Sequence, residues 1–458
     1  MRGKKKHYEM DMTQGPLLGN IIRFSLPLMF TGMLQLLYNA ADVVIVGRFA
    51  SAHALAAVSS TGAMINLIVG VFMGLSLGTS VAVAQAYGAG NYKDVQDTVH
   101  TSIAMAIVCG LVVSVLGLFL GKPLLRLMDT PEEVLDLASL YVSIYFSGSL
   151  FNLVYNFGAA ILRAVGDTRR PMYFLILSGL VNVVLNMFFV IVLDMSVAGV
   201  ALATVASQVL SAVLVVVCLI RSQSSIQLNP RRLRIVKDKA LKMIKIGIPA
   251  GLQGAIFSMS NVVIQSSVNS FGADAMAGNG AAANIEGFVY MAMNAFYTAS
   301  LTFTSQNLGA RKTERLGRIM WLCQGCVILT GIVLGAAVYA FRGPLIGIYC
   351  EEQHVIEFGM RRTAIIAAGH FFCGSMDVFV GGLRGMGKSF VPMIISILGS
   401  CMLRIIWVAT VFAAFRTPEV LYLCYPLSWA ITGLAQGVYY VMAKRKVTRE
   451  MALEAQTA

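Results

Sequence analysis

The sequence predicts an all-α membrane protein that crosses the bilayer many times. Three observations support this fold class: 12% of the 458 residues are charged, 57% are hydrophobic, and the mean hydropathy is +0.75. A typical soluble domain has about 25% charged residues, roughly twice this fraction. Disordered chains combine low hydrophobicity with dense charge, so that class is excluded as well. The long apolar runs are therefore expected to lie in lipid.

Twelve apolar runs are long enough to cross a bilayer as helices. An α-helix needs about 20 apolar residues for this and satisfies its own backbone hydrogen bonds in lipid, which an open strand cannot do. The expected spans, in order, are 21–47, 54–85, 98–120, 134–157, 171–193, 197–220, 243–270, 276–307, 318–341, 357–381, 390–415 and 419–443. An even number of spans returns the chain to its starting side, so both termini are expected on the same side.

The positions of Lys and Arg predict the orientation of these spans. The two tails and the loops after even-numbered spans hold 27 of the 35 basic residues. Because basic loops stay in the cytoplasm, both termini are expected to be cytoplasmic. The net charge of +13 is then a topology signal, and we expect no nucleic-acid partner, since no stretch is long enough to form a soluble basic domain.

The two halves of the chain repeat each other at a constant offset in residue number. The segment ILRAVGDTRRPM contains Arg163 and Pro171, and GLRGMGKSFVPM contains Arg384 and Pro392, so both pairs give an offset of 221. The same shift brings QAYGAG onto QNLGAR. Each repeat has six spans, so both enter the membrane in one orientation. Transporters built from such parallel repeats hold substrate between their halves and alternate access by rocking them.

This repeat divides the chain into two six-helix lobes with short basic segments around them. We expect a cytoplasmic tail over 1–20, an N-lobe over 21–220, a basic cytoplasmic linker over 221–242, a C-lobe over 243–443 and a cytoplasmic tail over 444–458. The linker is expected to be a solvated tether between the lobes.

Three acids lie inside predicted spans: Asp42, Glu286 and Asp377. Ionisable residues there are costly and are often functional. Asp42 completes a polar face at i, i+3, i+4 and i+7 that begins with Gln35, Tyr38 and Asn39. Such a face lines a wet cavity or holds a proton or cation; the structural alternative is a polar seam between packed helices.

Glu286 heads a second polar stripe, with Tyr290 and Asn294 at i+4 and i+8. Further amides follow one another at a spacing of four in other spans: Asn152 and Asn156, Asn182 and Asn186, Asn261 and Gln265. A line of amides binds substrate or ions, or holds helices together. Several such lines in both lobes favour a polar central cavity.

Asp377 and Arg404 are harder to interpret from sequence. Asp377 lies seven residues before Arg384, so a structural ion pair is the alternative to a functional role. Arg404 is a buried charge that needs a partner, and either Asp377 or a helix carbonyl could serve.

Two catalytic motifs match as strings but not in context. GLRGMGKS at 382–389 fits a nucleotide-binding loop and GLSLG at 74–78 fits a nucleophile elbow, yet both lie in membrane helices without the strand that each motif requires. Cys323 and Cys326 have no second pair, so no metal site is expected. We therefore expect a transporter without a cofactor, energised by an ion gradient, and not an enzyme.

Several motifs occur together along the whole chain: MTQGPLLGNIIRFSLPLM, YNAADVVIVGRF, QAYGAGNY, ILRAVGDTRRP, VAGVALATVASQ and LRGMGKSFVPM. With the register of the repeat, they resemble the multidrug and toxic compound extrusion (MATE) family, in its DinF-like bacterial branch. The resemblance implies a monomer in the bacterial inner (plasma) membrane. It also implies a secondary antiporter that exports small organic cations and drugs in exchange for H+ or Na+.

The resemblance also assigns roles to individual residues. Asp42 matches the helix-one Asp that the family uses in ion coupling, and Asn182 matches a nearby amide. Asn186 stands where related transporters often have Asp, and a neutral amide cannot take up a proton. Two interpretations therefore stay open: Asp42 alone takes up H+, or Asp42 with Asn39, Asn182 and Asn186 binds Na+. The expected substrate cavity comprises Gln35, Tyr38, Asn152, Asn156, Asn261, Gln265, Glu286, Tyr290, Asn294 and Asp377.

A lipid-linked oligosaccharide flippase of the wider superfamily is the alternative function. Such a protein should line its cavity with Arg or Lys to bind diphosphate. Only Arg404 is expected well inside a span, so we prefer the exporter.

Overall fold

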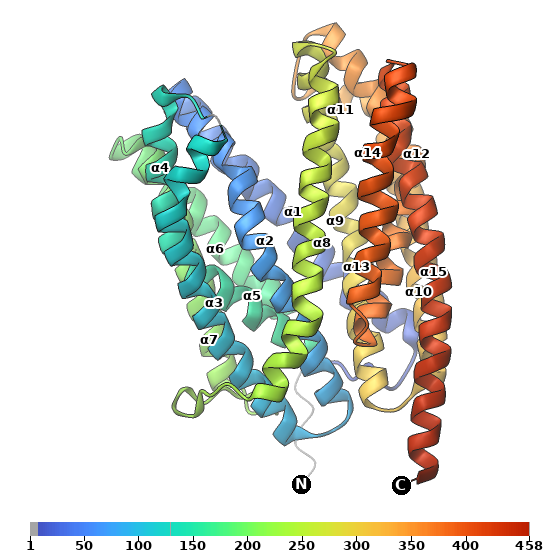
Figure 1. Ribbon diagram of the computed structural model, residues 1–458. Coiled ribbons are helices and arrows are strands. Elements are labelled where there is room, and N and C mark those ends of the chain that lie inside the picture. Colours follow the sequence, from blue (N-terminus) through green and yellow to red (C-terminus); the bar gives the residue numbers. More distant parts are fainter. Residues whose placement is uncertain (1–7, 129, 458) are drawn as a thin grey trace. The chain divides into compact units, whose positions relative to one another are not determined.

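The helical fold is seen in a computed structural model that describes residues 8–128 and 130–457. Within these two ranges every regular element is a helix (Figure 1). The chain forms two units. Unit 1 consists of Met33–Gly251 with the segment that ends at Asp11, and unit 2 consists of Met12–Gly32 with the chain from Leu252 onward.

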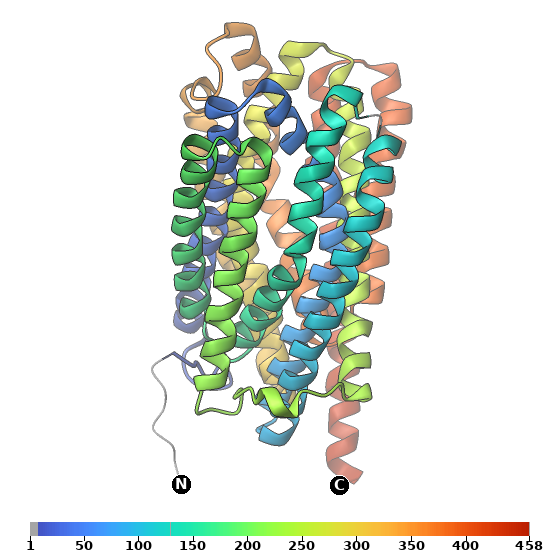
Figure 2. The same ribbon diagram turned by 90° about the vertical axis from the view of Figure 1, so that its left-hand side faces the viewer.

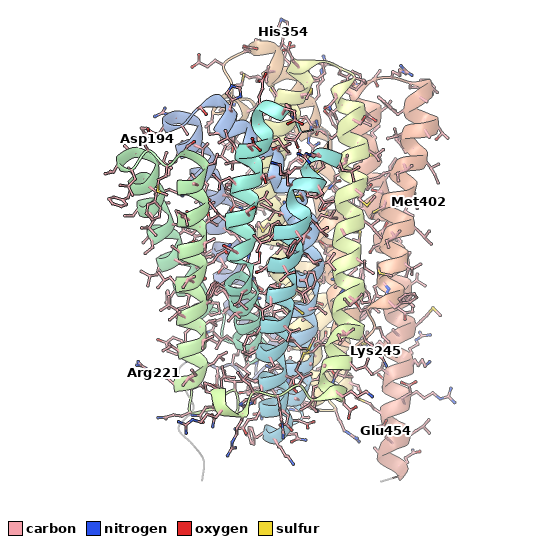
Figure 3. The ribbon with its side chains drawn as sticks, turned by 60° about the vertical axis from the view of Figure 1, so that its left-hand side comes forward. Asp194, Arg221, Lys245, His354, Met402 and Glu454 are labelled. Carbon is pink, nitrogen blue, oxygen red and sulfur yellow. The ribbon has the colours of Figure 1, made fainter. Side chains whose placement is uncertain are left out.

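The first half of the chain provides seven α-helices. They are α1 (Leu17–Phe49), α2 (Ala52–Gly88), α3 (Tyr92–Leu127), α4 (Glu132–Ser147), α5 (Ser149–Ala164), α6 (Arg169–Met187) and α7 (Ser196–Arg221). A π-helical segment, η1 (Phe188–Val192), continues α6. In Figure 2, α6 and α7 lie side by side in green. Figure 3 labels Asp194 and Arg221, which lie at opposite ends of α7.

The second half repeats this pattern with longer or more interrupted helices. They are α8 (Lys237–Asn269), α9 (Ala273–Gly309), α10 (Thr313–Ala340), α11 (Arg342–Gly347), α12 (Gln353–Gly385), α13 (Phe390–Ser396), α14 (Leu403–Trp407) and α15 (Pro418–Thr457). A π-helical segment, η3 (Ile397–Met402), joins α13 to α14. A second one, η4 (Val408–Phe412), continues α14. A short 3-10 turn, η2 (Pro230–Arg232), precedes α8.

Each of the twelve predicted spans coincides with one helix or one interrupted helix. Among the described residues, nine helices are long and apolar enough to cross a membrane, and ten if the pair α4 and α5 counts as one span bent by 46°. The helices α9 and α15 complete the twelve. Much of α9 is buried inside unit 2, and a helix surrounded by protein needs a less apolar surface than one that faces lipid.

The helix bounds confirm the internal repeat. Helices α2 and α9 start at 52 and 273 and end at 88 and 309, so the same offset of 221 relates both ends. The turns that follow also correspond: Gly90 and Arg311 have φ angles of 69° and 58°, and Gly166 and Gly387 have φ angles of 89° and 77°. Glycine adopts this left-handed conformation at little cost, which explains its place in three of these turns.

The two units do not coincide with the predicted lobes. Residues 17–32 of α1 belong to unit 2, and residues 237–251 of α8 belong to unit 1. Each change of unit follows a proline inside the helix, Pro27 in α1 and Pro249 in α8. Proline removes one helical hydrogen bond and lets the helix bend, so both positions suit a helix shared by two units.

The segments predicted as a tether and a tail are also more ordered than expected. In unit 1 the linker is held to α3, because Arg234 pairs with Asp97 at 2.6 Å and Lys239 pairs with Asp94 at 2.9 Å. The tail predicted from 444 onward continues α15 as a helix up to Thr457. Both segments therefore belong to the folded units.

Glycines bring α2 and α8 into close backbone contact within unit 1. Gly74 and Gly78 lie one turn apart on α2, and Gly247 and Gly251 lie one turn apart on α8. A Cβ atom at Gly74 would overlap the backbone of both α8 glycines. This is the small-xxx-small packing of membrane helices. It gives the GLSLG string a structural role.

We expect Gly74→Leu to destabilise unit 1, because its side chain would force the two backbones apart. Overpacking of this kind costs about 1–3 kcal/mol. Thermal unfolding of purified protein measures the effect, with Gly70→Leu as the matched control, since a Cβ at Gly70 meets nothing within 4 Å. Equal melting temperatures for the two variants would contradict the close packing.

Candidate functional site

Asp42 of α1 contacts Asn186 of α6 within unit 1, and Asn186 in turn contacts Asn182. The Nδ2 atom of Asn186 donates to Oδ1 of Asp42 at 2.5 Å and lies 3.2 Å from Oδ1 of Asn182. Asn186 is completely buried and Asn182 is 5% exposed. Three of the four predicted ion-coupling residues are therefore in direct contact.

This acid–amide cluster keeps unused acceptors. Among the described residues, Asp42 takes part in no ion pair, and the buried Oδ1 atom of Asn186 has no hydrogen-bond partner. Oxygen acceptors next to an unneutralised carboxylate suit a small cation or a proton. The π-helical segment η1 begins two residues after Asn186, and such segments often occur at functional sites.

The other polar residues of α1 are less closely involved. Tyr38 donates its hydroxyl to the carbonyl oxygen of Ile176 on α6 at 3.3 Å. Asn39 and Gln35 are exposed, and neither side chain makes a hydrogen bond within 8–128 and 130–457. The Na+ interpretation included Asn39 as a fourth ligand, but its side chain makes no hydrogen bond to the other three residues.

The predicted cavity residues of α5 bind each other. Asn156 donates to Oδ1 of Asn152 at 2.6 Å, and Asn152 donates to the Tyr145 hydroxyl at 3.4 Å. These contacts satisfy much of the polarity of the two amides inside unit 1. They favour a structural role for the two amides, which is to hold helices together, over a role in substrate binding.

Glu286 is neutralised by an arginine that the sequence analysis did not identify. Nη2 of Arg362 on α12 lies 2.7 Å from Oε2 of Glu286 on α9, and Nε lies 3.2 and 3.3 Å from its two oxygens. Both side chains are 9% exposed. Arg362 also donates to Asn279 at 2.7 Å. Two-point contact between two buried side chains is typical of a structural ion pair, so the contacts of Glu286 favour the structural of its two possible roles.

The same network reaches α8 and α15 of unit 2. Asn279 donates to Gln265 at 2.8 Å, and Gln265 donates to Asn269 at 2.9 Å. Tyr422 donates to Asn279 at 3.3 Å. Gln265, which was predicted to line the cavity, thus belongs to a series of hydrogen bonds that continues through Asn279 to the Arg362 guanidinium.

Asp377 lies close to the side chain of Tyr290, another predicted cavity residue. The predicted ion pair with Arg384 is not among the ion pairs of the described residues. Arg384 instead donates to the Tyr297 hydroxyl at 2.7 Å and to Oε1 of Gln253 at 2.9 Å. Asp377 and Tyr290 therefore remain a candidate polar pair in unit 2.

Arg404 has neither of its two predicted partners. Its Nε donates to the Ser428 hydroxyl at 2.9 Å, and its guanidinium lies 4.4 Å from the centre of the Tyr425 ring. A hydroxyl and an aromatic face thus stabilise this buried charge. The remaining predicted cavity residues, Asn261 and Asn294, form no side-chain hydrogen bond in the described part of the chain.

The acid–amide cluster occurs in one half of the repeat only. At the offset of 221, Asp42 corresponds to Val263 and Asn186 corresponds to Trp407. Asp377 corresponds to Asn156. In the described ranges no group of three or more His, Cys, Asp or Glu side chains that could hold a metal ion occurs.

These features define a polytopic helical membrane protein made of two homologous six-span halves, with one unneutralised acid–amide cluster in its first half. The MatE family model matches residues 27–188 and 249–410, once in each half. The chain belongs to the MatE family. The two matches start at Pro27 and Pro249, which lie 222 residues apart, one more than the offset of 221 that relates the later motifs.

Relatives resemble the chain over nearly its whole length. It is 27% identical to the "Probable multidrug resistance protein YoeA" of Bacillus subtilis, over 93% of this chain and 94% of that protein. It is 21% identical to the "Multidrug export protein MepA" of Staphylococcus aureus, over 86% and 88%.

Solved structures share the fold. An outward-facing multidrug resistance MATE family transporter of the MOP superfamily superposes with a TM-score of 0.90 at 20% identity, over 97% of this chain and 100% of the other. A MOP superfamily transporter from Pyrococcus furiosus also gives a TM-score of 0.90 at 20% identity, over 97% and 99%. The predicted twelve-helix fold in two lobes is confirmed.

We expect Glu286→Gln to destabilise unit 2 strongly, because it leaves the Arg362 charge buried without a counter-ion. Breaking a buried pair from one side costs about 3–5 kcal/mol. The double variant Glu286→Gln with Arg362→Met should recover much of this loss. Thermal unfolding in detergent measures both, with Glu314→Gln in the first turn of α10 as control. A single variant that melts like the control would contradict the structural role of the pair.

Proposed function

We propose that this protein is a secondary antiporter that exports small organic cations and drugs in exchange for H+ or Na+. The observation that carries the proposal is the contact of Asp42 with Asn186, which also contacts Asn182. The carboxylate has no cationic partner among the described residues. Membership of the MatE family and the multidrug resistance and export names of its relatives support the substrate class.

The proposed mechanism follows from the cost of a bare carboxylate inside a span. An isolated charge in the membrane is strongly unfavourable, so a bound H+ or Na+ stabilises the site by neutralising Asp42. Neutralisation also weakens the charge-assisted hydrogen bond from Asn186, which joins α1 to α6. The ion thereby changes a contact between two helices of unit 1, and a ligand that binds two conformations unequally shifts their populations.

The orientation in the membrane is part of the proposal. The helices identify a multi-span membrane protein, and the bacterial relatives support a plasma-membrane location. We propose that both termini are cytoplasmic, because 27 of the 35 basic residues lie in the tails and the loops after even-numbered spans.

The flippase alternative gains little support. Unit 2 contains three buried arginines rather than the single one expected, but Arg362 is neutralised by Glu286. Arg384 and Arg404 donate to neutral groups of the same unit. The relatives named above carry multidrug resistance or export names. The exporter therefore remains the better-supported function.

Transport of ethidium by purified protein in liposomes tests the proposal. An inward H+ gradient and an inward Na+ gradient are imposed in separate experiments. We expect one of the two gradients to drive ethidium efflux, and that gradient identifies the coupling ion. Transport at the same rate without any gradient would contradict antiport.

We expect Asp42→Asn to abolish gradient-driven ethidium transport, because a neutral amide cannot take up H+ and has no negative charge to bind Na+. The matched control is Asp136→Asn, which removes an exposed acid that pairs with Lys122 in the same unit. The control should transport like the parent protein. Full coupled transport by Asp42→Asn would refute the role of this carboxylate.

A further inference from the structure

A large groove in unit 2 contains none of the predicted substrate residues. It has a volume of about 1010 Å³ and lies between α10, α12 and α15, which are neighbours in Figure 1. Its apolar lining includes Trp321, Phe372, Phe379, Leu434 and Val438. The volume is at the upper end of the range of about 300–1,000 Å³ for small-molecule pockets.

The apolar lining is presented outward. Trp321 is 68% exposed and Leu434 is 73% exposed. Large exposed apolar surface in a chain that spans the membrane is expected to contact acyl chains. Gly433 and Gly437 of α15 also line the groove.

One end of the groove is basic. Lys444, Arg445 and Arg449 line it there, on the last turns of α15. Within the described ranges none of these three residues takes part in an ion pair, whereas their neighbour Lys446 pairs with Glu450 at 3.9 Å. Three uncompensated cations at the end of an apolar groove complement a ligand with an anionic head and apolar tails.

The length of the groove matches one leaflet. Trp429 and Lys444 both line it and are 15 residues apart on α15, which corresponds to about 22 Å at 1.5 Å per residue. Half of a bilayer with its headgroups is about 20–22 Å thick. A lipid whose phosphate lies at Lys444 would therefore extend its chains to about the depth of Trp429.

We propose that this groove is a binding site for an anionic phospholipid of the surrounding leaflet. The phosphate would be bound by Lys444, Arg445 and Arg449, and the acyl chains would lie against Trp321, Phe372 and neighbouring apolar side chains. Basic pockets at the ends of membrane helices bind anionic head groups in this way. The inference concerns a site separate from Asp42 and does not depend on the transported substrate.

Tryptophan fluorescence provides a direct test. The chain has three Trp residues, of which Trp321 and Trp429 line the groove. Trp407 is not among its lining residues and donates to the carbonyl oxygen of Val420. The variant Trp407→Phe/Trp429→Phe leaves Trp321 as the only reporter. It is placed in bilayers that contain phosphatidylglycerol or phosphatidylcholine with dibrominated acyl chains, which quench Trp on contact.

We expect the apparent affinity for brominated phosphatidylglycerol to exceed that for brominated phosphatidylcholine by about five-fold or more, the effect of a single basic residue near a membrane surface. The triple variant Lys444→Gln/Arg445→Gln/Arg449→Gln should reduce the ratio to about one. The control triple Arg311→Gln/Arg318→Gln/Lys446→Gln removes the same charge outside the groove and should keep the preference.

Two results would overturn the proposal. Equal quenching by both lipids in the parent would mean that the groove holds lipid without regard to its head group. An equal loss of preference in the control triple would mean that the general charge of this region attracts the lipid. Neither result bears on ethidium transport, so the test is independent of the antiporter function.

Discussion

The energetic cost of a charge inside the membrane governs how the polar side chains of both units are arranged. In unit 2, Glu286 is neutralised by Arg362, and Arg404 is stabilised by Ser428 and the Tyr425 ring. In unit 1, Asp42 accepts a hydrogen bond from the neutral amide of Asn186 and has no ion-pair partner among the described residues. Asp42 has no counter-ion among the described residues, which distinguishes it from the structural charges and makes it the acid to which we assign ion coupling.

The repeat supplies a common scaffold, but its two halves carry different chemistry. Helices α2 and α9 correspond residue for residue at an offset of 221, as do the turns that follow them. Yet Asp42 corresponds to Val263, and Asp377 corresponds to Asn156. Close glycine packing, such as that of α2 on α8, maintains the scaffold while polar positions vary between the halves. Ion coupling is therefore proposed for the first half alone.

Much of the fold could be predicted from the sequence because apolar runs of span length and repeated turn motifs are local signals. The meeting of Asp42 with Asn186 was expected only from the family resemblance, because polar stripes on two helices do not by themselves show that the helices meet. The pairing of Glu286 with Arg362 was not, because residues 76 positions apart meet only through the packing of α9 on α12. The packing of residues 17–32 of α1 with unit 2 and the groove between α10, α12 and α15 likewise depend on tertiary structure, which leaves no periodic signal in the sequence.

We propose that Asp42 exchanges a cation for the transported compound. Release of the cation on substrate binding can be measured by adding ethidium to purified protein in weakly buffered detergent solution and monitoring H+ and Na+ separately. We expect the parent protein to release one of the two ions and Asp42→Asn to release neither. Release of neither ion by the parent, or equal release by the variant, would contradict this proposal.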